Sequence, residues 1–341
     1  AYDRVKQIIV IVMTVAGINP LTGMTLNLDS IAAKGKFPKL CVDIYNHCDR
    51  LFNSSDTSYV MDIGYNMNVK LRSNNWFDYN NLHFTDKGNI EMMSPSTNTI
   101  GFDITYQAIS LGYDININKL FGSYDRTKSK FNFDFSCALL SASFYSIKNN
   151  TGMNITEYNR RDVDKLKFNG IKTSEWGIEA NYFFNNKRYC YAAAFSFSKL
   201  QKKSQGSFAL GLSYVNQDYR FDFSKLPQEL NYSGPEDYSA TGQSFGIKIG
   251  YGYNWVPQKN ITVGISESIV PALVIANSSE SRKRYSFRLS NRLYLSMVWN
   301  QDRWFVGIVA KSNIAMIYDD KAALACGLFS TEVKLGWRFR I

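Results

Sequence analysis

Only two histidines, His47 and His83, are available for acid–base chemistry in this chain of 341 residues. A lipid-modifying enzyme of the acyl hydrolase or deacylase type needs a histidine beside a nucleophilic serine. One Gly-x-Ser-x-Gly pattern, at residues 242–246, would supply Ser244. That pattern normally makes a sharp turn from a strand into a helix, but here it opens a strand-like alternation. We therefore interpret the match as chance and His83 as a solvated strand residue. No catalytic residue is predicted, and a barrel-wall lipid-modifying enzyme is the alternative.

Other chemistry has little support. The acids Glu236, Asp237 and Asp319 fall in predicted loops, where acids usually serve solvation, so proteolysis at a loop rim is a further alternative only. The five cysteines are odd in number and scattered, which gives neither a disulfide framework nor a zinc pattern. Cys41 and Cys48 could pair in an oxidising compartment, although two separate thiols are the simpler interpretation. No phosphate loop or dinucleotide fingerprint occurs, so we predict no cofactor and no metal.

The net charge is +10, from 39 Lys and Arg against 29 Asp and Glu. The basic residues do not form a block or a helix face, and they recur singly at alternate positions of strand-like segments. This dispersal argues against nucleic acid as a partner. It favours an enclosed interior or a lipid surface rich in phosphate.

Charged side chains gather on one face of two segments near the chain end, 284–299 and 329–341, whose other face is apolar. Such period-2 alternation is typical of a strand. In an outer-membrane barrel the apolar face meets lipid and the charged face meets the lumen. Asp103 and Asp114 lie at lumen parity on an earlier arc. We predict that these charged residues line the lumen: Arg284, Arg288, Arg292, Glu332, Lys334, Arg338, Arg340, Lys248, Glu175 and Glu179.

Two functions remain open for such a lumen. A positive wall facing a negative wall could conduct small solutes with a preference for anions. The same charges could instead pair across the interior, because charges in a low-dielectric space need partners, and we prefer this reading. The predicted function is therefore non-enzymatic, either a narrow solute pore or a structural or accessory barrel.

The last residues also fit the C-terminal signal by which outer-membrane barrels are recognised for insertion. The signal residues are Lys334, Gly336, Phe339 and Ile341. We accordingly expect the barrel-assembly machinery as a partner during insertion, and outer-membrane lipid and lipopolysaccharide afterwards. The basic run 282–284 ends a predicted outer loop, where arginine could bind lipopolysaccharide phosphates.

Strand-like alternation from Tyr59 onward predicts an all-β fold, a transmembrane antiparallel β-barrel of about twelve strands, with a range of about ten to fourteen. Residues 102–117 alternate with a one-residue slip, which predicts a β-bulge. Residues 131–147 read as one strand, and a tight hairpin at 185–187 leads into a further strand at 189–197. Residues 159–173 are charged and read as an exposed loop.

Loop lengths predict the orientation of the barrel. The longer connections at 222–242, 277–283 and 319–321 are expected to face outward, and the turns at 257–260 and 301–302 to face the periplasm.

The N-terminal part has a different character. Residues 1–25 resemble an export signal, with a basic start and a short apolar core. Residues 26–57 are predicted as a periplasmic segment, and residues 58–341 as the barrel. One helical face within the periplasmic segment is apolar and predicts a short amphipathic helix; its residues are Leu40, Ile44, Cys48, Leu51 and Phe52.

Three stretches resemble a family of Bacteroidetes outer-membrane barrels that is catalogued as a domain of unknown function. They are Asp56–Val60, then residues 193–196 with 201–204 and 206–208, and finally Phe221–Pro227. The resemblance covers about residues 56–341. It implies a barrel in the bacterial outer membrane, with a possible accessory role in a larger complex, and it supplies no activity.

Overall fold

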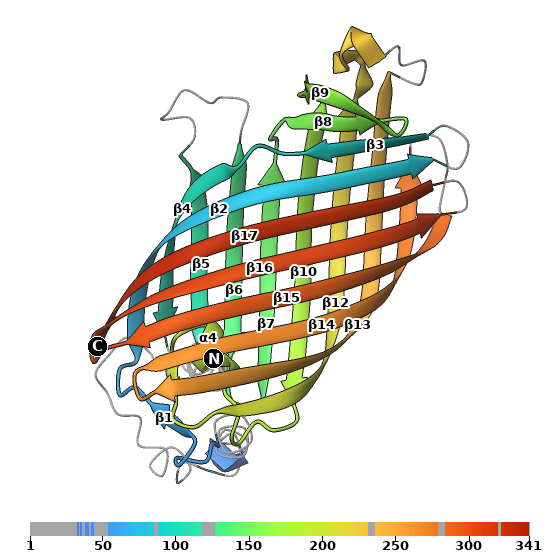
Figure 1. Cartoon of the computed structure of the whole chain (residues 1–341). Coiled ribbons are helices and arrows are strands. Elements are labelled where there is room, and N and C mark those ends of the chain that lie inside the picture. Colours follow the sequence, from blue (N-terminus) through green and yellow to red (C-terminus); the bar gives the residue numbers. More distant parts are fainter. Residues whose placement is uncertain are drawn as a thin grey trace.

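Twelve antiparallel strands form a closed barrel in the part of the chain that the computed structural model describes (Figure 1). The described residues are 33, 35, 38–40, 42–43, 54–84, 88–106, 108–117, 127–230, 236–278, 284–319 and 322–340. The wall strands, in order around the ring, are β2 (Met67–Phe84), β4 (Thr97–Tyr106), β5 (Ile109–Asn116), β6 (Lys128–Ser136), β7 (Leu140–Asn149), β10 (Ile171–Phe183), β12 (Gln205–Asp222), β13 (Asp237–Gln258), β14 (Ile261–Ser278), β15 (Arg284–Asn300), β16 (Trp304–Asp319) and β17 (Ala322–Phe339). Pairing of β17 with β2 closes the ring.

Alternation sets the two faces of the wall. On β17 the apolar Val333, Leu335 and Trp337 are exposed, whereas Glu332 and Lys334 are buried. Large exposed apolar side chains cover the outer wall of the other strands in the same way. A predominantly apolar outer surface with a polar, buried inside is the arrangement of a membrane barrel.

Tryptophans gather at one end of the barrel. Trp304 of β16 pairs with Trp337 of β17, and the Trp304 ring lies 5.0 Å from that of Trp299. Trp255 of β13 is exposed near the same end. Such aromatic girdles mark membrane–water interfaces. We call these four residues the Trp belt. No helix among the described residues is long and apolar enough to cross a membrane.

The two ends of the barrel differ in their connections. The proximal end holds Met67 and Phe339, which pair with one another, and the distal end holds Phe84 and Ala322. The predicted long connections at 222–242, 277–283 and 319–321 all join strands at the distal end. The short turns at 257–260 and 301–302 lie at the proximal end.

A small sheet covers the distal end. β3 (Gly88–Met93) continues the pairing of β2 beyond β4, and Pro95 stands where the two strands separate. The hairpin of β8 (Met153–Tyr158) and β9 (Arg161–Phe168), which joins β7 to β10, pairs with β3. Figure 1 shows these strands lying across the top of the barrel. We call this layer, with the 3-10 helices η2 (Phe223–Lys225) and η3 (Gln228–Leu230), the distal cap.

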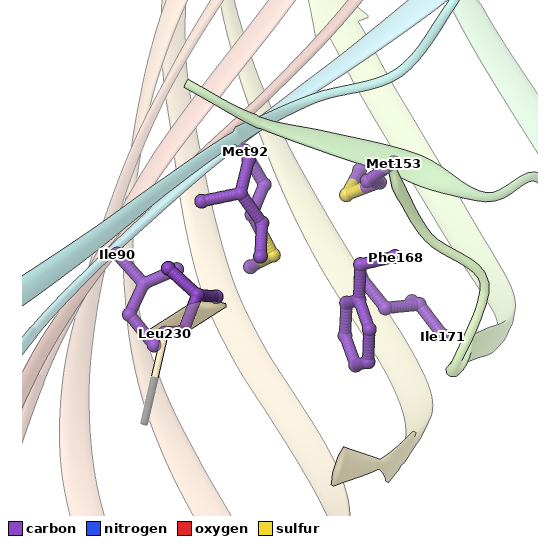
Figure 2. Close-up of a cluster of buried hydrophobic side chains, with 7 residues drawn as sticks. Ile90, Met92, Met153, Phe168, Ile171 and Leu230 are labelled. Carbon is purple, nitrogen blue, oxygen red and sulfur yellow. The ribbon is translucent and has the colours of Figure 1, made fainter. Parts of the chain in front are cut away.

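An apolar cluster holds the distal cap together. Figure 2 shows Ile90 and Met92 of β3 converging on Met153, Phe168, Ile171 and Leu230. Phe168 is fully buried and its ring stacks on that of Phe223 at 6.1 Å. The cap thus has its own core above the polar interior.

Residues 184–204, between β10 and β12, enter the barrel at the proximal end; we call them the plug. They contain α4 (Tyr191–Phe195) and β11 (Lys199–Gln201), which pairs with β1 (Val60–Asp62). Figure 1 places α4 inside the lower part of the barrel. Ala192, Ala193 and Ala194 are buried there.

Several sequence predictions for individual strands were wrong, although the predicted fold and strand number are confirmed. The slip within 102–117 is the turn of the β4–β5 hairpin and not a bulge. Residues 131–147 form two strands, β6 and β7, with a turn at 137–139. The predicted strand 189–197 is the plug with its helix, because it is apolar on both faces and is packed inside. The predicted loop 159–173 forms β9 and the start of β10.

The predicted N-terminal elements fall mostly outside the described residues. Residues 38–40 and 42–43 are helical, whereas Ile44, Cys48, Leu51 and Phe52 lie outside the described part, as does the predicted export signal at 1–25.

Candidate functional site in the barrel interior

Arg72 of β2 lies at the centre of a buried cluster formed by four neighbouring strands. Its guanidinium is 2.8 Å from the carboxylates of Asp103 on β4 and Asp114 on β5, and its side chain is 5% exposed. Arg72 Nη2 also donates to Asn132 Oδ1 on β6 at 3.0 Å. A Cβ at Gly101 of β4 would collide with Arg72 Nε and Asp114 Oδ1, so this glycine makes room for the ion pair.

Glu332 forms a second buried group on the adjacent strands. Its carboxylate is 2.7 Å from Lys311 Nζ on β16 and 2.8 Å from Lys334 Nζ on its own strand. Both lysines therefore share one carboxylate, which is a compact way to neutralise charge in a low-dielectric interior.

Glu179 of β10 forms a third group across the lumen from Glu332. It is paired with Lys248 of β13 at 3.1 Å and with Arg292 of β15. Arg292 Nη2 also lies 3.5 Å from Ser213 Oγ on β12. This group ties together side chains from β10, β12, β13 and β15.

Arg288 reaches a carboxylate only through an amide. Its Nη1 donates to Gln217 Oε1 at 3.2 Å, and Gln217 Nε2 donates to Glu175 at 2.5 Å. The hydroxyl of Tyr145 donates to the same Glu175 carboxylate at 2.8 Å. Arg288 Nε donates to Ser290 Oγ at 3.0 Å.

A polar cavity of about 100 Å³ lies between these charges and the distal cap. Arg288, Glu175 and the Lys128–Asp78 ion pair at 3.0 Å line it from below, and Met153 and Ile171 of the cap cluster line it from above. A space of this size, lined in part by charged groups, is large enough for several water molecules.

The plug is seated in the wall by two side chains. Arg338 Nη2 on β17 donates to the Phe197 carbonyl oxygen at 2.9 Å and to Asn300 Oδ1 at 2.6 Å. Its guanidinium lies 4.4 Å from the centre of the Phe305 ring, and only 1% of Arg338 is exposed. On the other side Asn254 Nδ2 donates to the Cys190 carbonyl oxygen at 2.8 Å.

Glycines in the wall make room for the plug. A Cβ at Gly307 of β16 would lie 2.5 Å from the Phe197 ring, and one at Gly264 of β14 would lie 2.5 Å from Ala194 Cβ. Cys190 is buried with Val60, Ala192 and Ala193, and this burial raises the pKa of its thiol, which is therefore neutral near pH 7.

The chain before the barrel is fastened to both ends of the plug. The backbone N–H of Asp56 donates to the Lys187 carbonyl oxygen at 2.7 Å, and that of Lys202 donates to the Tyr59 carbonyl oxygen at 2.6 Å. Arg188 and Lys203 each lie 5.1 Å from the centre of the Tyr59 ring. Hydrogen bonds from Ser58 lower the pKa of the Asp56 carboxyl.

The structure places most of the predicted lumen residues in the buried interior, as the groups above show. Arg340 is an exception, because it lies past the end of β17, is exposed, and donates to the Gly64 carbonyl oxygen at 2.9 Å. The strand had ended one residue before it. The side chain of Arg284 and the whole of Ile341 lie outside what the structure describes.

The predicted insertion signal occupies the proximal end of β17. Lys334 is buried beside Glu332, a Cβ at Gly336 would collide with the Phe305 ring, and Phe339 is half-buried. The histidine and serine of the alternative enzyme are not brought together. His83 is exposed at the distal end of β2, whereas Ser244 is buried on β13, which is five strands away around the ring.

Sequence reasoning missed Arg72, Asp78 and Lys128. The alternation of Lys70, Arg72 and Trp76 with Leu71 could have revealed the first, but the segment 73–75 is polar on both faces and hides the period. Among the described residues, no group of three or more His, Cys, Asp or Glu side chains is placed to hold a metal ion.

Comparison with protein families gives one match, to a model described as "Domain of unknown function (DUF4421)", over residues 54–339. A comparison with curated proteins gives no match.

Solved structures with a similar fold include outer-membrane proteins. The outer membrane protease OmpT from Escherichia coli has 8% identity and a TM-score of 0.38, with 80% of this chain and 97% of that chain covered. The β domain of the Bordetella autotransporter BrkA has 9% identity and a TM-score of 0.35, with 80% and 100% covered. The transport unit of the autotransporter AIDA-I from Escherichia coli has 11% identity and a TM-score of 0.34, with 80% and 90% covered.

Proposed function

This chain belongs to the DUF4421 family, and we propose that it is a non-enzymatic protein of the bacterial outer membrane whose barrel is closed by its own chain. Its role is structural or accessory. Its partners are outer-membrane lipid and lipopolysaccharide, with the barrel-assembly machinery acting during insertion.

The outer wall supports the membrane location. Apolar side chains such as Leu212, Ile249 and Leu335 are exposed on it, and the Trp belt marks one rim. Exposed apolar surface of this extent is not stable in water and indicates contact with a membrane. A closed ring of strands satisfies its own backbone hydrogen bonds, which a spanning structure requires.

The main evidence for a closed barrel is the plug, which is bound to the inner wall. From the proximal end to the distal end the interior holds the plug, the groups around Glu332, Arg72 and Glu179, and then the distal cap. The charged side chains of these three groups are paired with one another along the inner wall, so a passing ion would have to break these pairs. The second candidate is a solute pore that opens when the plug is displaced. It is favoured by the cavity of about 100 Å³ beside Arg288, which no side chain of the described residues fills.

Planar-bilayer recording tests this proposal. We expect the whole chain to be silent. A variant in which residues 188–203 are replaced by a flexible Gly-Ser linker separates the two barriers: conductance from this variant would show that the plug is the seal, and continued silence would show that the paired charges and the distal cap close the barrel without it. Stable conductance steps from the whole chain would show that it is an open pore. Cell fractionation with heat-modifiable migration on a gel tests the location independently.

A further inference from the structure

Polar side chains interrupt the apolar outer wall on the neighbouring strands from β14 to β4, and on β2 and β4 they include the exposed Ser73 and Asn98. Five of these residues lie one on each strand from β14 to β2. We call them the polar strip: Glu267 on β14, Asn291 on β15, Ser312 on β16, Thr331 on β17 and Asn75 on β2. Glu267 and Ser312 both pair with Leu293, and Thr331 pairs with Asn75. All five therefore fall within three adjacent rows of outward-facing residues.

Glu267 lies well inside the lipid-facing band. Val263, on the same strand, pairs with Trp255 of the Trp belt. Four residues of strand separate Val263 from Glu267, which is about 13 Å, and the apolar band of such a barrel is about 25 Å tall. Its outward neighbours along the strand, Ile265 and Ile269, are exposed and apolar.

Lipid cannot satisfy this carboxylate. Asn291 Nδ2 donates to Glu267 Oε1 at 3.0 Å, and the side chain of Glu267 is otherwise exposed. A polar group left unbonded in hydrocarbon is strongly destabilising, because nothing replaces the water it has lost. An ionisable residue facing into the membrane therefore indicates a specific partner.

The next two strands around the ring from β14, which are β13 and β12, carry apolar side chains where the strip would continue. The outward residues of β12 run Phe208, Leu210 and Leu212, and those of β13 include Ile247 and Ile249, all of them exposed. The polar strip is thus a property of one side of the barrel and not of the whole band.

We propose that the polar strip is the contact surface between two copies of this chain in the membrane. The strip is balanced about β16, the middle of its five strands. One flank presents the Glu267 carboxylate and the second N–H of the Asn291 amide. The other flank presents the exposed hydroxyl of Thr331, a donor, and the Asn75 carbonyl oxygen, an acceptor.

The Asn75 amide is oriented for that role. Its Nδ2 already donates to Ser96 Oγ at 2.6 Å and to Asn98 Oδ1 at 2.8 Å, which leaves its Oδ1 to accept. A two-fold axis along the membrane normal beside Ser312 sets each flank against the other flank of the second copy. Such a self-complementary contact is isologous, the commonest kind in symmetric dimers.

Disulfide cross-linking in outer-membrane fractions tests this contact. The five native cysteines are replaced by serine, and Ser312→Cys is introduced at the axis. Its matched control is Ile247→Cys, an exposed position on the apolar wall. After oxidation we expect an adduct of twice the chain mass from Ser312→Cys and none from Ile247→Cys.

The role of the Glu267 carboxylate is tested in the same chain, which carries Ser312→Cys as its single cysteine. Glu267→Leu removes the carboxylate and should abolish the Ser312→Cys adduct, while Glu267→Gln keeps a hydrogen-bonding group and should retain it. Heat-modifiable migration shows that each variant is folded in the membrane.

Several results would overturn the proposal: no adduct from a folded Ser312→Cys protein, an adduct of another mass, equal adducts from both positions, or an adduct that survives Glu267→Leu. The inference rests on the proposed membrane location, and its failure is distinguishable from that one. A chain absent from the outer-membrane fraction contradicts the location, whereas a membrane-inserted chain without adduct contradicts only the dimer.

Discussion

The side chain of Arg338 binds the backbone of Phe197: the guanidinium Nη2 donates to the Phe197 carbonyl oxygen at 2.9 Å. The bond joins the last wall strand to the plug, and the same guanidinium covers the Phe305 ring. One buried side chain thus links the proximal rim to the segment that fills it.

Loss of Arg338 should loosen the plug. In Arg338→Ala the Phe197 carbonyl oxygen and Asn300 lose their charged donor, and hydrogen bonds to charged groups contribute about 1.5–3 kcal/mol each. We expect faster maleimide labelling of Cys190, which is buried in the native protein, in a chain whose other cysteines are serine. The control is Arg340→Ala, whose side chain is exposed. Equal labelling of both variants would contradict the anchoring role.

A larger side chain in the wall where Phe197 packs should also loosen the plug. A side chain at Gly307 would enter the space of the Phe197 ring, so Gly307→Val should displace the plug and raise Cys190 labelling. Gly242→Ala is a matched control, because a Cβ there meets only Val274 at an ordinary contact distance of 3.5 Å. Unchanged labelling in Gly307→Val would show that the plug does not depend on this seat.

Removal of Arg72 should destabilise the barrel strongly. Asp103 and Asp114 would be left without their counter-charge, and breaking a buried pair in this way typically costs about 3–5 kcal/mol. Urea unfolding in detergent micelles measures the loss. Adding Asp103→Asn and Asp114→Asn to Arg72→Met should recover part of it.

Arg220 provides the matched control for that experiment. It pairs with Asp218 at 3.3 Å with 71% of its side chain exposed, and such pairs contribute about 0–1 kcal/mol. Comparable losses from Arg220→Ala and Arg72→Ala would contradict the structural importance of the buried cluster.

Acid should release the segment that fastens the plug. The pKa of the Asp56 carboxyl is lowered by hydrogen bonds from the Ser58 hydroxyl and backbone, so folding favours its ionised form. The stabilisation is therefore complete above the ordinary pKa of 3.8 and is lost as the pH falls through the lowered value. Hydrogen exchange at the Ser58 amide should accelerate there. Asp56→Asn should remove that dependence on pH.

The alternative enzyme gives a distinct expectation. His83→Ala and Ser244→Ala should leave the lipid A and phospholipid profiles of cells unchanged, because the two side chains lie on strands far apart around the ring. Mass spectrometry of extracted lipids measures this. A turnover that either substitution abolishes would support a lipid-modifying enzyme instead.

The fold could be predicted because its main determinant is local. On β13 to β17 the alternation of apolar and polar residues is long and regular, and these strands appear as predicted. The correct strand number concealed errors of opposite sign, since two hairpins were read as single strands whereas the plug was read as an additional wall strand. A two-residue turn and a bulge shift the alternation alike, so the slip at 107–108 could not be assigned from the sequence.

The ion pairs inside the barrel were harder to predict from the sequence, because the order of the strands around the ring determines which side chains meet. Parity could place Glu179 and Arg292 inside, but their contact depends on the order of β10, β12, β13, β14 and β15 around the wall. The plug was missed for a similar reason. Tyr189, Ala193 and Phe197 fit both a strand and a helical spacing. The wall glycines that make room for Tyr189 and Phe197 indicate that this segment packs inside the barrel, but their position opposite it is known only from the structure.

The seam between β2 and β17 bears on how the molecule is built. Most neighbouring wall strands follow one another closely along the chain, but the seam joins Met67 to Phe339. Until β17 has been synthesised and placed, β2 and β16 keep open edges, which invite pairing with other chains. The carbonyl oxygen of Phe197 likewise lacks its charged donor before Arg338 is present. Assembly must therefore finish with ring closure and plug docking together, and a chain cut short near its C-terminus would lack both.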